Sequence, residues 1–154
     1  MKKAILLFSF FITLFAFSAN ANAQRNIEPK VERDPILEAD AKHNLEVVQQ
    51  YFKLKKAYKA VLDRFEETFA AYPDFSKMDE FLYYAGMSSY YLSENKGKQK
   101  IDLKTEKDKE KYAPERLREN AVVYLKMIVE KYPQSDYKKD AEKTLKVLEN
   151  VGKN

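Results

Sequence analysis

Apolar residues recur at helical spacing in five segments of the chain, separated by short polar stretches. Asp34 and Pro35 precede the first segment. Because aspartate supplies an N-cap oxygen and proline suits the first helical position, this pair predicts that a helix begins there. A short turn is expected at Lys53–Lys56. The stripe that follows the helix start, at spacings of four, three and four residues, consists of Ala41, Leu45, Val48 and Phe52.

The second helical segment ends at the dipeptide Tyr72-Pro73. Proline disfavours helical geometry in the residue before it and lacks an N–H donor, so the helix is expected to stop at this point. The residues of this segment therefore form a helix of about four turns with a single apolar side. That apolar side consists of Tyr58, Val61, Leu62, Phe65 and Phe69.

A third helix is expected to begin at a capping box formed by Ser76 and Asp79. It runs through the segment DEFLYYAGMSSYYL and is expected to end near Asn95, with Gly97 taking the left-handed conformation that terminates many helices. Residues 96–113 are different in kind, because they are rich in lysine, nearly free of apolar residues and without a clear period. They predict a loop.

Pro114 is expected to open a fourth helix, which stops at Tyr132-Pro133, and Ser135 is placed to cap a fifth helix. No segment has the alternation of apolar and polar residues that is typical of a strand, so the predicted fold class is all-α. The stripe of the fourth helix is Leu117, Ala121, Leu125 and Ile128, and that of the fifth is Tyr137, Ala141, Leu145 and Leu148.

The Tyr-Pro ending occurs twice, with Pro73 and Pro133 lying 60 positions apart. A helical hairpin of the tetratricopeptide kind repeats after about 34 residues, so this spacing exceeds one repeat by about 26. The excess is attributed to the lysine-rich insertion, which lies between the two helices of the second hairpin. A shift of 60 pairs residues of the same class, namely Val61 with Ala121, Phe65 with Leu125, Phe69 with Val129 and Tyr72 with Tyr132.

These positions resemble those of tetratricopeptide repeats. The resemblance implies two helical hairpins and a C-terminal capping helix over residues 34–151. In the second A helix, Ser89 stands where the repeat usually has an aromatic residue, and Tyr90 follows it. The residues that match a B helix are Val61, Phe65 and Pro73, then Ala121, Leu125 and Pro133. Those that match an A helix are Leu45, Val48 and Phe52, then Leu82, Ala85 and Gly86.

The segment YLKMIVEKYPQSDYKKDAEKTLKVLE is similar to repeats in the family of the D component of the outer-membrane β-barrel assembly machinery. The likeness spans Ala39 to Glu149. That family consists of periplasmic tetratricopeptide-like lipoproteins that bind other proteins. The resemblance implies a non-catalytic periplasmic scaffold with other envelope proteins as partners, while the oligomeric state is left open. The chain departs from the family in having about two repeats in place of about five, and in having no cysteine.

The first 23 residues have the layout of a secretory signal peptide. Lys2 and Lys3 precede an apolar run from Ala4 to Phe17, and Ala21-Asn22-Ala23 favours cleavage before Gln24. The alternative is an uncleaved membrane anchor, but the run is short against the roughly 20 residues of a spanning helix. Residues 24–33 are interpreted as a flexible leader. Without a cysteine to carry lipid, the exported protein is expected to be soluble or held at the outer membrane by a partner.

Composition disfavours two classes of function. Removing Lys2 and Lys3 leaves 26 basic residues against 24 acidic ones, so no strong single-sign field points to nucleic acid. An enzyme is also disfavoured, because cysteine is absent, His43 is the only histidine, and the three glycines form no phosphate-binding loop. No catalytic residue, metal or cofactor is predicted. His43 is interpreted as a solvated residue of the first helix, with a groove contact as the alternative.

A partner-binding groove is the remaining hypothesis for a site. Tyrosine suits an interface because its ring buries area while its hydroxyl stays satisfied, although it suits a core equally well. In the aromatic cluster of the third helix, Tyr84 and Tyr91 are expected to pack between hairpins. The residues that the repeat resemblance places in the groove are Glu46, Gln50, Glu80, Tyr83, Met87 and Tyr90.

The lysine-rich insertion 96–113 supports a second hypothesis, a cell-envelope module that binds anionic lipid or cell-wall polymer. The alternative is a solvated, mobile insertion, which the interleaved charges favour. Any membrane association is therefore expected to be indirect or to run through this insertion. Its charged residues are Lys96, Lys98, Lys100, Lys104, Lys107, Lys109 and Lys111, with Asp102, Glu106, Asp108 and Glu110.

Overall fold

The computed structural model describes residues 33–99, 101 and 103–151, and every regular element within these ranges is a helix. The predicted signal peptide and nearly all of the predicted leader lie outside the described residues. No helix in the described part is long and apolar enough to cross a membrane. The elements are α2 (Pro35–Gln50), the π-helix η1 (Tyr51–Lys55), α3 (Tyr58–Ala71), α4 (Met78–Ser93), α5 (Glu106–Lys111), α6 (Pro114–Lys131) and α7 (Lys138–Val151).

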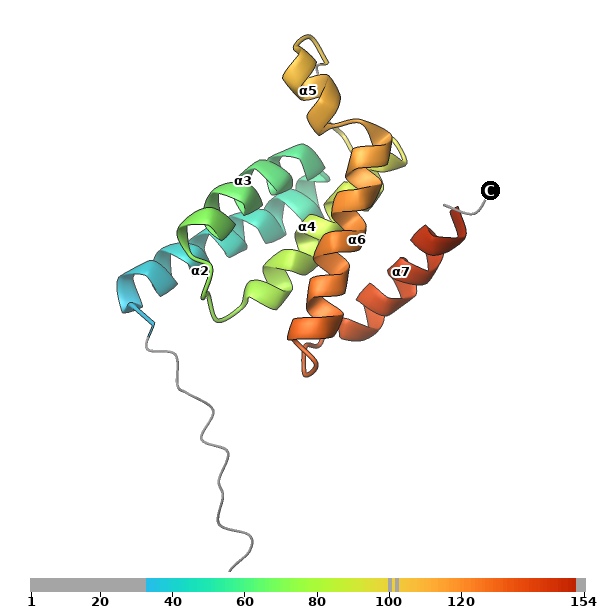
Figure 1. Cartoon of the computed structure of the whole chain (residues 1–154). Helices are drawn as coiled ribbons and strands as arrows, with labels where there is room; N and C mark the ends of the chain where they lie inside the picture. The colour runs from blue at the N-terminus through green and yellow to red at the C-terminus, as the bar shows by residue number, and fades with distance from the viewer. Residues whose placement is uncertain (1–32, 100, 102, 152–154) are drawn as a thin grey trace, which may run out of the picture. The chain divides into compact units, whose positions relative to one another are not determined.

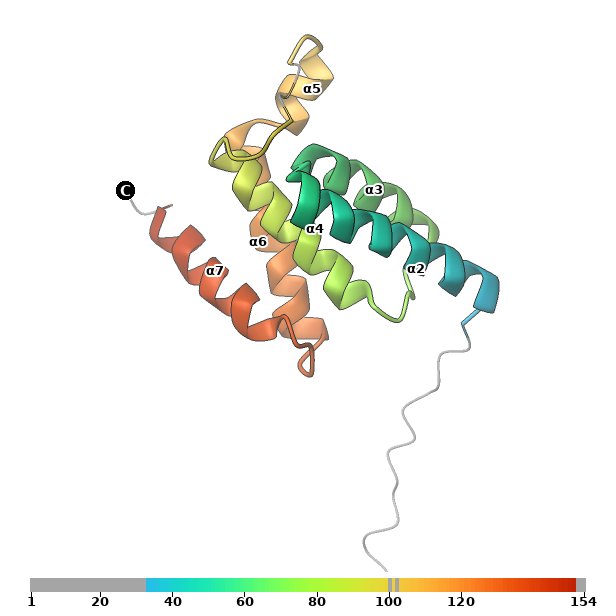
Figure 2. The ribbon, with the colours of Figure 1, turned by 180° about the vertical axis from the view of Figure 1, so that it is seen from behind.

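Two antiparallel hairpins and a final helix make up this part of the chain (Figure 1). The first hairpin pairs α2 and η1 with α3, the second pairs α4 with α6, and α7 packs on α6. Because α2 and α3 also contact α4, each hairpin covers an apolar side of the other. Figure 2 shows α2, α4 and α7 in front of α3 and α6, as the A and B helices of a tetratricopeptide-like array are arranged. The predicted all-α fold is confirmed.

Both helices that were predicted to begin at proline do so. Asp34 Oδ1 accepts hydrogen bonds from the backbone N–H groups of Ile36 at 2.8 Å and Leu37 at 3.4 Å. Pro35 then occupies the first position of α2, and Pro114 occupies the first position of α6. Proline costs nothing there, because the first N–H groups of a helix have no partner within the helix.

The turns that follow α3 and α6 have the same backbone structure. The N–H of Phe75 donates to the carbonyl of Tyr72 at 3.2 Å, and the N–H of Ser135 donates to the carbonyl of Tyr132 at 3.0 Å. The two tyrosines also share backbone angles, with φ −135° and ψ 62° in the first turn and φ −126° and ψ 65° in the second. The 60-residue spacing read from the sequence is therefore confirmed in the hydrogen bonding of the chain.

The predicted capping box is wrong, because α4 begins at Met78 without a side-chain cap. Ser76 instead donates from its hydroxyl, and from its backbone N–H at 3.2 Å, to the carboxylate of Glu38 at the start of α2. Asp79 likewise accepts from the hydroxyl of Ser135 at 2.6 Å. In each repeat, an acidic residue near the start of the A helix thus holds a serine of the turn that follows the B helix. Ser76 makes this long-range contact in place of a local cap, whereas Ser135 also accepts from the backbone N–H of Tyr137 at 3.2 Å, just ahead of α7.

The predicted turn at Lys53–Lys56 is also different in the structure. The chain continues from α2 into the π-helical η1, and only Lys56 and Ala57 separate η1 from α3, with Lys56 at φ 48° in the left-handed region. The N–H of Lys56 donates to the carbonyl of Tyr51 in the wider π turn, and the N–H of Ala57 donates to the same carbonyl at 2.9 Å. Apolar periodicity does not distinguish a short π segment from the end of an α-helix, so the π segment could not be recognised from the pattern of apolar residues.

The end of α4 and the insertion need two corrections. Asn95, not Gly97, takes the left-handed conformation that ends α4, with φ 53°. The N–H of Lys96 then donates to the carbonyl of Tyr91 at 2.8 Å, as in a Schellman cap. Residues 96–113 were predicted to be a loop, but they contain the six-residue helix α5.

The predicted core is confirmed where the two repeats align. Paired positions have matching burial, which shows that the B helices α3 and α6 occupy equivalent places. Val61 and Ala121 are completely buried, Phe65 and Leu125 are at most 1% exposed, and Phe69, Val129, Tyr72 and Tyr132 are all half-buried. Phe52 and Tyr137, which were also predicted on inner stripes, are half-buried.

Gly86 sets the distance between α4 and α6. A Cβ added to this glycine would lie 2.8 Å from Cγ and Cδ2 of Leu125, closer than side chains pack. Leu125 is fully buried and has little room to move aside. The small-residue position of the A helix is therefore used for close helix–helix packing, as the repeat resemblance implied.

Candidate functional site

The outward side of α2, α4 and α7 forms the candidate site, here called the A-helix face. It carries the sequence-predicted groove residues Glu46, Gln50, Glu80, Tyr83, Met87 and Tyr90. Glu46 and Gln50 are exposed on α2, whereas Glu80, Tyr83 and Tyr90 are half-buried on α4. These five side chains are reached by solvent on neighbouring A helices.

Tyr83 lies at the centre of this face. Its ring stacks on that of Tyr137, with centroids 4.6 Å apart and planes inclined by 27°, and it meets the ring of Tyr84 edge to face at 5.6 Å. Burial, and then the nearby Asp140 carboxylate, raise the pKa of Tyr83, so its hydroxyl stays protonated at neutral pH. One ring face is thus covered by Tyr137, while the half-buried side chain still reaches solvent.

Glu80 joins the three A helices. Its Oε1 accepts a hydrogen bond of 2.6 Å from Nε2 of Gln49 on α2. Burial, followed by the neighbouring Glu80 carboxylate, strongly raises the pKa of Tyr137, just ahead of α7. The carboxylate is therefore fixed between a donor on α2 and the start of α7, which holds the polar part of the face in a defined geometry.

The remaining groove residues of α4 differ in accessibility. Met87 is only 8% exposed, and its sulfur accepts a weak hydrogen bond of 3.5 Å from the hydroxyl of Thr144 on α7. Tyr90 is half-buried, with the Lys96 ammonium 5.7 Å from its ring centroid. Met87 therefore supports the packing of α7, whereas Tyr90 stays within reach of a partner.

The aromatic cluster of α4 divides as expected between the core and the surface. Tyr84 is 2% exposed and its ring lies 5.0 Å from that of Phe52. Tyr91 lies 5.1 Å from Tyr58 and 5.9 Å from Phe52, measured between ring centroids. Both therefore pack against the first hairpin, which confirms their predicted place between hairpins. Tyr83 and Tyr90 remain as the aromatic residues available for contact.

Two residues that contact tyrosines of α4 were missed in the sequence analysis. Tyr137 was placed on the inner stripe of the last helix, but its ring is half-buried and covers Tyr83. Lys53 was placed in a turn, but its ammonium lies 5.5 Å from the centroid of the Tyr84 ring. The 60-residue shift aligns α7 with α4 and so marks α7 as a further A helix, but it pairs Tyr137 with Lys77, outside the predicted groove positions, and gave no signal for the contact with Tyr83. Nothing in the local pattern marked Lys53.

The described ranges show no candidate metal centre. No group of three or more histidine, cysteine, aspartate or glutamate side chains gathers there in a way that could hold a metal ion. His43 is exposed on α2. What the A-helix face offers is aromatic area beside fixed polar groups, which suits contact with another protein.

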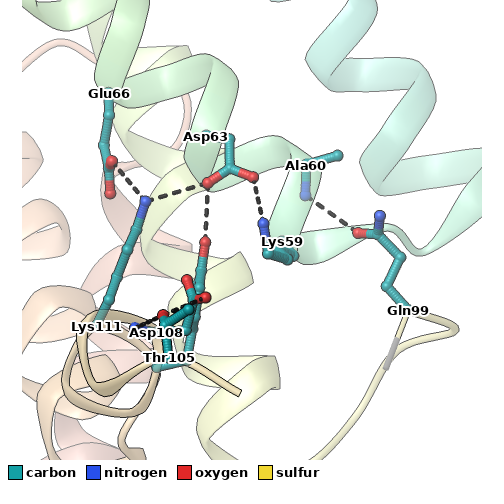
Figure 3. Close-up of polar contacts among 9 residues, drawn as sticks. Lys59, Ala60, Asp63, Glu66, Gln99, Thr105, Asp108 and Lys111 are labelled. Atoms are coloured by element: carbon teal, nitrogen blue, oxygen red, sulfur yellow. Dashed lines mark hydrogen bonds and ion pairs between the residues drawn. The ribbon is translucent and has the colours of Figure 1, made fainter. Parts of the chain in front are cut away.

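The insertion is fastened to α3 through Asp63 (Figure 3). Its Oδ1 accepts from the Lys111 ammonium at 3.1 Å and from the Tyr112 hydroxyl at 2.8 Å, and its Oδ2 accepts from the Lys59 ammonium at 2.8 Å. Lys111 also reaches Glu66 at 2.8 Å. This set, called the Asp63 clamp, joins residues nearly fifty positions apart. It gives the short helix α5 a fixed attachment to the first hairpin.

Two further contacts order the insertion. Thr105 caps α5 by accepting from the N–H of Asp108 at 3.0 Å, and its hydroxyl donates to the Asp108 carboxylate at 2.7 Å. Gln99 Oε1 accepts from the N–H of Ala60 at 3.1 Å, as Figure 3 shows. Ala60 lies in the first turn of α3, where N–H groups lack partners within the helix. The insertion thus supplies the cap that α3 lacks.

Protonation of Asp63 is expected to loosen the clamp. Burial alone would raise the pKa of Asp63, but hydrogen bonds from Lys59, Tyr112 and Lys111 outweigh it and hold that pKa below its usual value. Such a carboxyl adds stability above its unfolded pKa of about 3.9 and loses it as the pH falls through the folded pKa. Because the side chain is 39% exposed, Asp63→Asn should cost only about 1 kcal/mol of unfolding free energy at neutral pH.

Urea unfolding at pH 7 and in acid near pH 3 measures this effect, and the difference between wild type and Asp63→Asn should shrink in acid. Glu67→Gln is the matched control, since Glu67 pairs with Arg64 at 3.4 Å on the same helix but is 70% exposed. It should change little at either pH. An equal loss for Asp63→Asn at both pH values would contradict the charge-dependent clamp.

The chain matches the model of a known protein family. The sequence profile of the YfiO family, described as outer membrane lipoprotein, matches residues 20–151. No curated protein and no solved structure matches the chain significantly. The profile spans the two hairpins and α7, so the family resemblance extends over the whole A-helix face.

Proposed function

This chain belongs to the YfiO family of outer membrane lipoproteins, and from that membership we propose that it is an exported, non-catalytic scaffold that binds other envelope proteins during outer-membrane protein assembly. The observation that carries the proposal is the A-helix face. Stacked helical hairpins present such surfaces for binding, and here the surface holds aromatic residues in fixed positions. The proposed location is the periplasmic side of the outer membrane.

The chemistry of the face fits a protein segment with both apolar and polar groups. Tyr83 and Tyr90 supply half-buried rings, the kind of amphipathic side chain that is enriched at interfaces. Glu46 and Gln50 supply exposed polar groups on the neighbouring helix. Glu80, held by Gln49, needs no reordering to accept a hydrogen bond from the partner, which lowers the entropic cost of binding.

The first test is alanine substitution at Tyr83 and Tyr90. Each change removes an accessible ring, and we expect each to weaken capture of envelope partners about tenfold, the size of a contact worth about 1.4 kcal/mol. Capture is measured as the amount of envelope protein that co-purifies with the exported chain. Val123→Ala, on the exposed side of α6, is the control and should leave capture unchanged.

Thermal unfolding followed by circular dichroism accompanies the capture measurement. The two tyrosine variants should unfold within a few degrees of wild type, because neither ring is fully buried. Unchanged capture with an intact fold would contradict the proposal. If a variant failed to fold, the substituted tyrosine would belong to the core and would no longer count as a residue of the binding surface.

A further inference from the structure

The last turn of α4 and the insertion enclose a cleft of about 680 Å³. That volume lies within the range of about 300–1,000 Å³ that is typical of small-molecule sites. The cleft is formed by segments other than the predicted groove positions. Its lining residues are Leu92, Ser93, Asn95, Lys96, Gly97, Lys98, Gln99, Ile101, Leu103, Tyr112 and Pro114, called the insertion cleft below.

Among the described residues that line the insertion cleft, two are cations, Lys96 and Lys98, and none is acidic. Within the described ranges, no carboxylate lies at ion-pair distance from the ammonium group of Lys96 or Lys98. Glu94, the nearest acidic residue along the chain, pairs instead with Arg118 at 3.7 Å. Lys96 lies over the Tyr90 ring, a contact that orients the ammonium without neutralising it. The two ammonium groups therefore bring positive charge to the cleft that no carboxylate of the described residues pairs with.

The other wall of the insertion cleft is apolar. Leu92 is 6% exposed, Tyr112 is 4% exposed, and Ile101 is half-buried. Leu103 is 46% exposed although it is a large aliphatic side chain in a segment that is otherwise rich in charge. An apolar wall beside unpaired cations is the arrangement that a molecule with a charged head and an apolar body would satisfy.

The walls of the cleft are ordered before any ligand binds. Gly97 has φ 119°, and a Cβ there would lie 2.9 Å from the Tyr58 ring, so only glycine fits. The N–H of Lys98 donates to the carbonyl of Lys56 at 3.0 Å. Gln99 bonds to α3, and the Tyr112 hydroxyl bonds to Asp63, as described for the clamp. Preformed walls avoid the entropic cost of ordering on binding.

We propose that the insertion cleft binds an anionic amphiphile, with its phosphate or carboxylate head between Lys96 and Lys98 and its apolar body against Leu92, Ile101 and Leu103. The two charges account for the head, and the aliphatic wall accounts for the body. An acidic protein segment would use the lysines but would leave the aliphatic wall exposed. The cleft shares no lining residue with the A-helix face, although Lys96 also lies over the ring of Tyr90, and the two proposals are tested by different measurements, lipid binding and protein capture.

Isothermal titration calorimetry of the exported chain tests the proposal with three soluble probes. They are dioctanoylphosphatidylglycerol as monomer, its head group alone as glycerol 3-phosphate, and the neutral amphiphile octyl glucoside. We expect the lipid monomer to bind tightest, because only it has both the head and the body. Vesicles with and without phosphatidylglycerol then show whether the ligand is also taken from a bilayer.

Two variants locate the binding. Lys96→Gln combined with Lys98→Gln should weaken binding of the lipid monomer about 30-fold, taking about 1 kcal/mol for each lysine. Leu103→Ser should weaken it several-fold while sparing glycerol 3-phosphate. The matched control removes two exposed charges from α6, Lys126→Gln with Lys131→Gln, and should bind like wild type.

Three results would overturn the proposal. The first is that the control pair weakens lipid binding as much as the cleft pair does, which would show that binding depends only on the net charge of the protein. The second is equal affinity for glycerol 3-phosphate and the lipid monomer, which would leave the apolar wall without a role. The third is binding of a hexaglutamate peptide, but not of the lipid, through Lys96 and Lys98, which would assign the cleft to an acidic protein.

Discussion

Replacing Phe65 with alanine is expected to lower the free energy of unfolding by about 3–5 kcal/mol. Phe65 lies on α3 and is 1% exposed. Its ring centroid lies 5.6 Å from that of Phe81 on α4 and 4.9 Å from that of Tyr124 on α6, with Phe69 of its own helix at 5.3 Å. One side chain thus joins both hairpins, and its removal leaves a cavity that rigid helices cannot close.

Urea unfolding monitored by circular dichroism measures this loss, and the slope of the transition should stay unchanged. Phe69→Ala is the matched control, because Phe69 is on the same helix and stacks on Phe65 but is only half-buried. Phe69→Ala should lower the free energy of unfolding clearly less than Phe65→Ala does. A loss below about 1 kcal/mol for Phe65→Ala, typical of a surface substitution, would show that the hairpins do not depend on this contact.

Leu125→Ala is expected to cost about 2–5 kcal/mol. Leu125 is fully buried on α6 and its side chain lies against the backbone of Gly86. Truncation opens space where the two helices of the second hairpin are closest. The substitution therefore removes apolar burial at the contact that holds α4 and α6 together.

A double-mutant cycle with Gly86→Ala separates that contact from general loss of packing. Alone, Gly86→Ala should destabilise by about 1–3 kcal/mol through overpacking, since the new methyl group collides with Leu125. In the Leu125→Ala background the collision is gone. The double substitution should therefore cost less than the sum of the two single substitutions, by more than about 0.5 kcal/mol. Additive costs would contradict the close approach of Gly86 and Leu125.

The architecture could be predicted because it rests on local and periodic features. The Tyr-Pro endings stop α3 and α6 by backbone sterics alone. The stripes that include Phe65 and Leu125 follow from helical spacing, and the 60-residue shift relates them. The endings and the stripes need only nearby residues, and the shift is a comparison within the same chain, so a single sequence was sufficient for the all-α fold and its two hairpins.

The errors occur where a distant partner decides the outcome. Ser76 was predicted to cap α4, but Glu38, nearly forty positions earlier, takes its hydrogen bonds. The insertion was predicted as a loop, but α5 is held by the clamp on the distant Asp63 in addition to its local cap at Thr105. A propensity argument considers neither the Glu38 contact nor the clamp, because tertiary partners lie outside its window.

A distant partner also explains why the predicted groove residues differ in accessibility. Met87 has the spacing of an exposed A-helix residue, and it is buried because α7 lies beside it. Tyr83 keeps its place on the face but acquires Tyr137 as a stacking partner. Sequence spacing gives the direction of a side chain from its own helix, whereas its accessibility depends on the neighbouring helix.

In-cell photocrosslinking tests the scaffold proposal most directly. A photoreactive residue at Gln50, exposed on the A-helix face, is compared with one at Val123, exposed on α6 away from that helix's buried stripe. The account predicts that Gln50 captures envelope proteins of the outer-membrane assembly machinery and that Val123 does not. Equal capture at both positions, or capture of only lipid or glycan at Gln50, would contradict a protein-binding A-helix face.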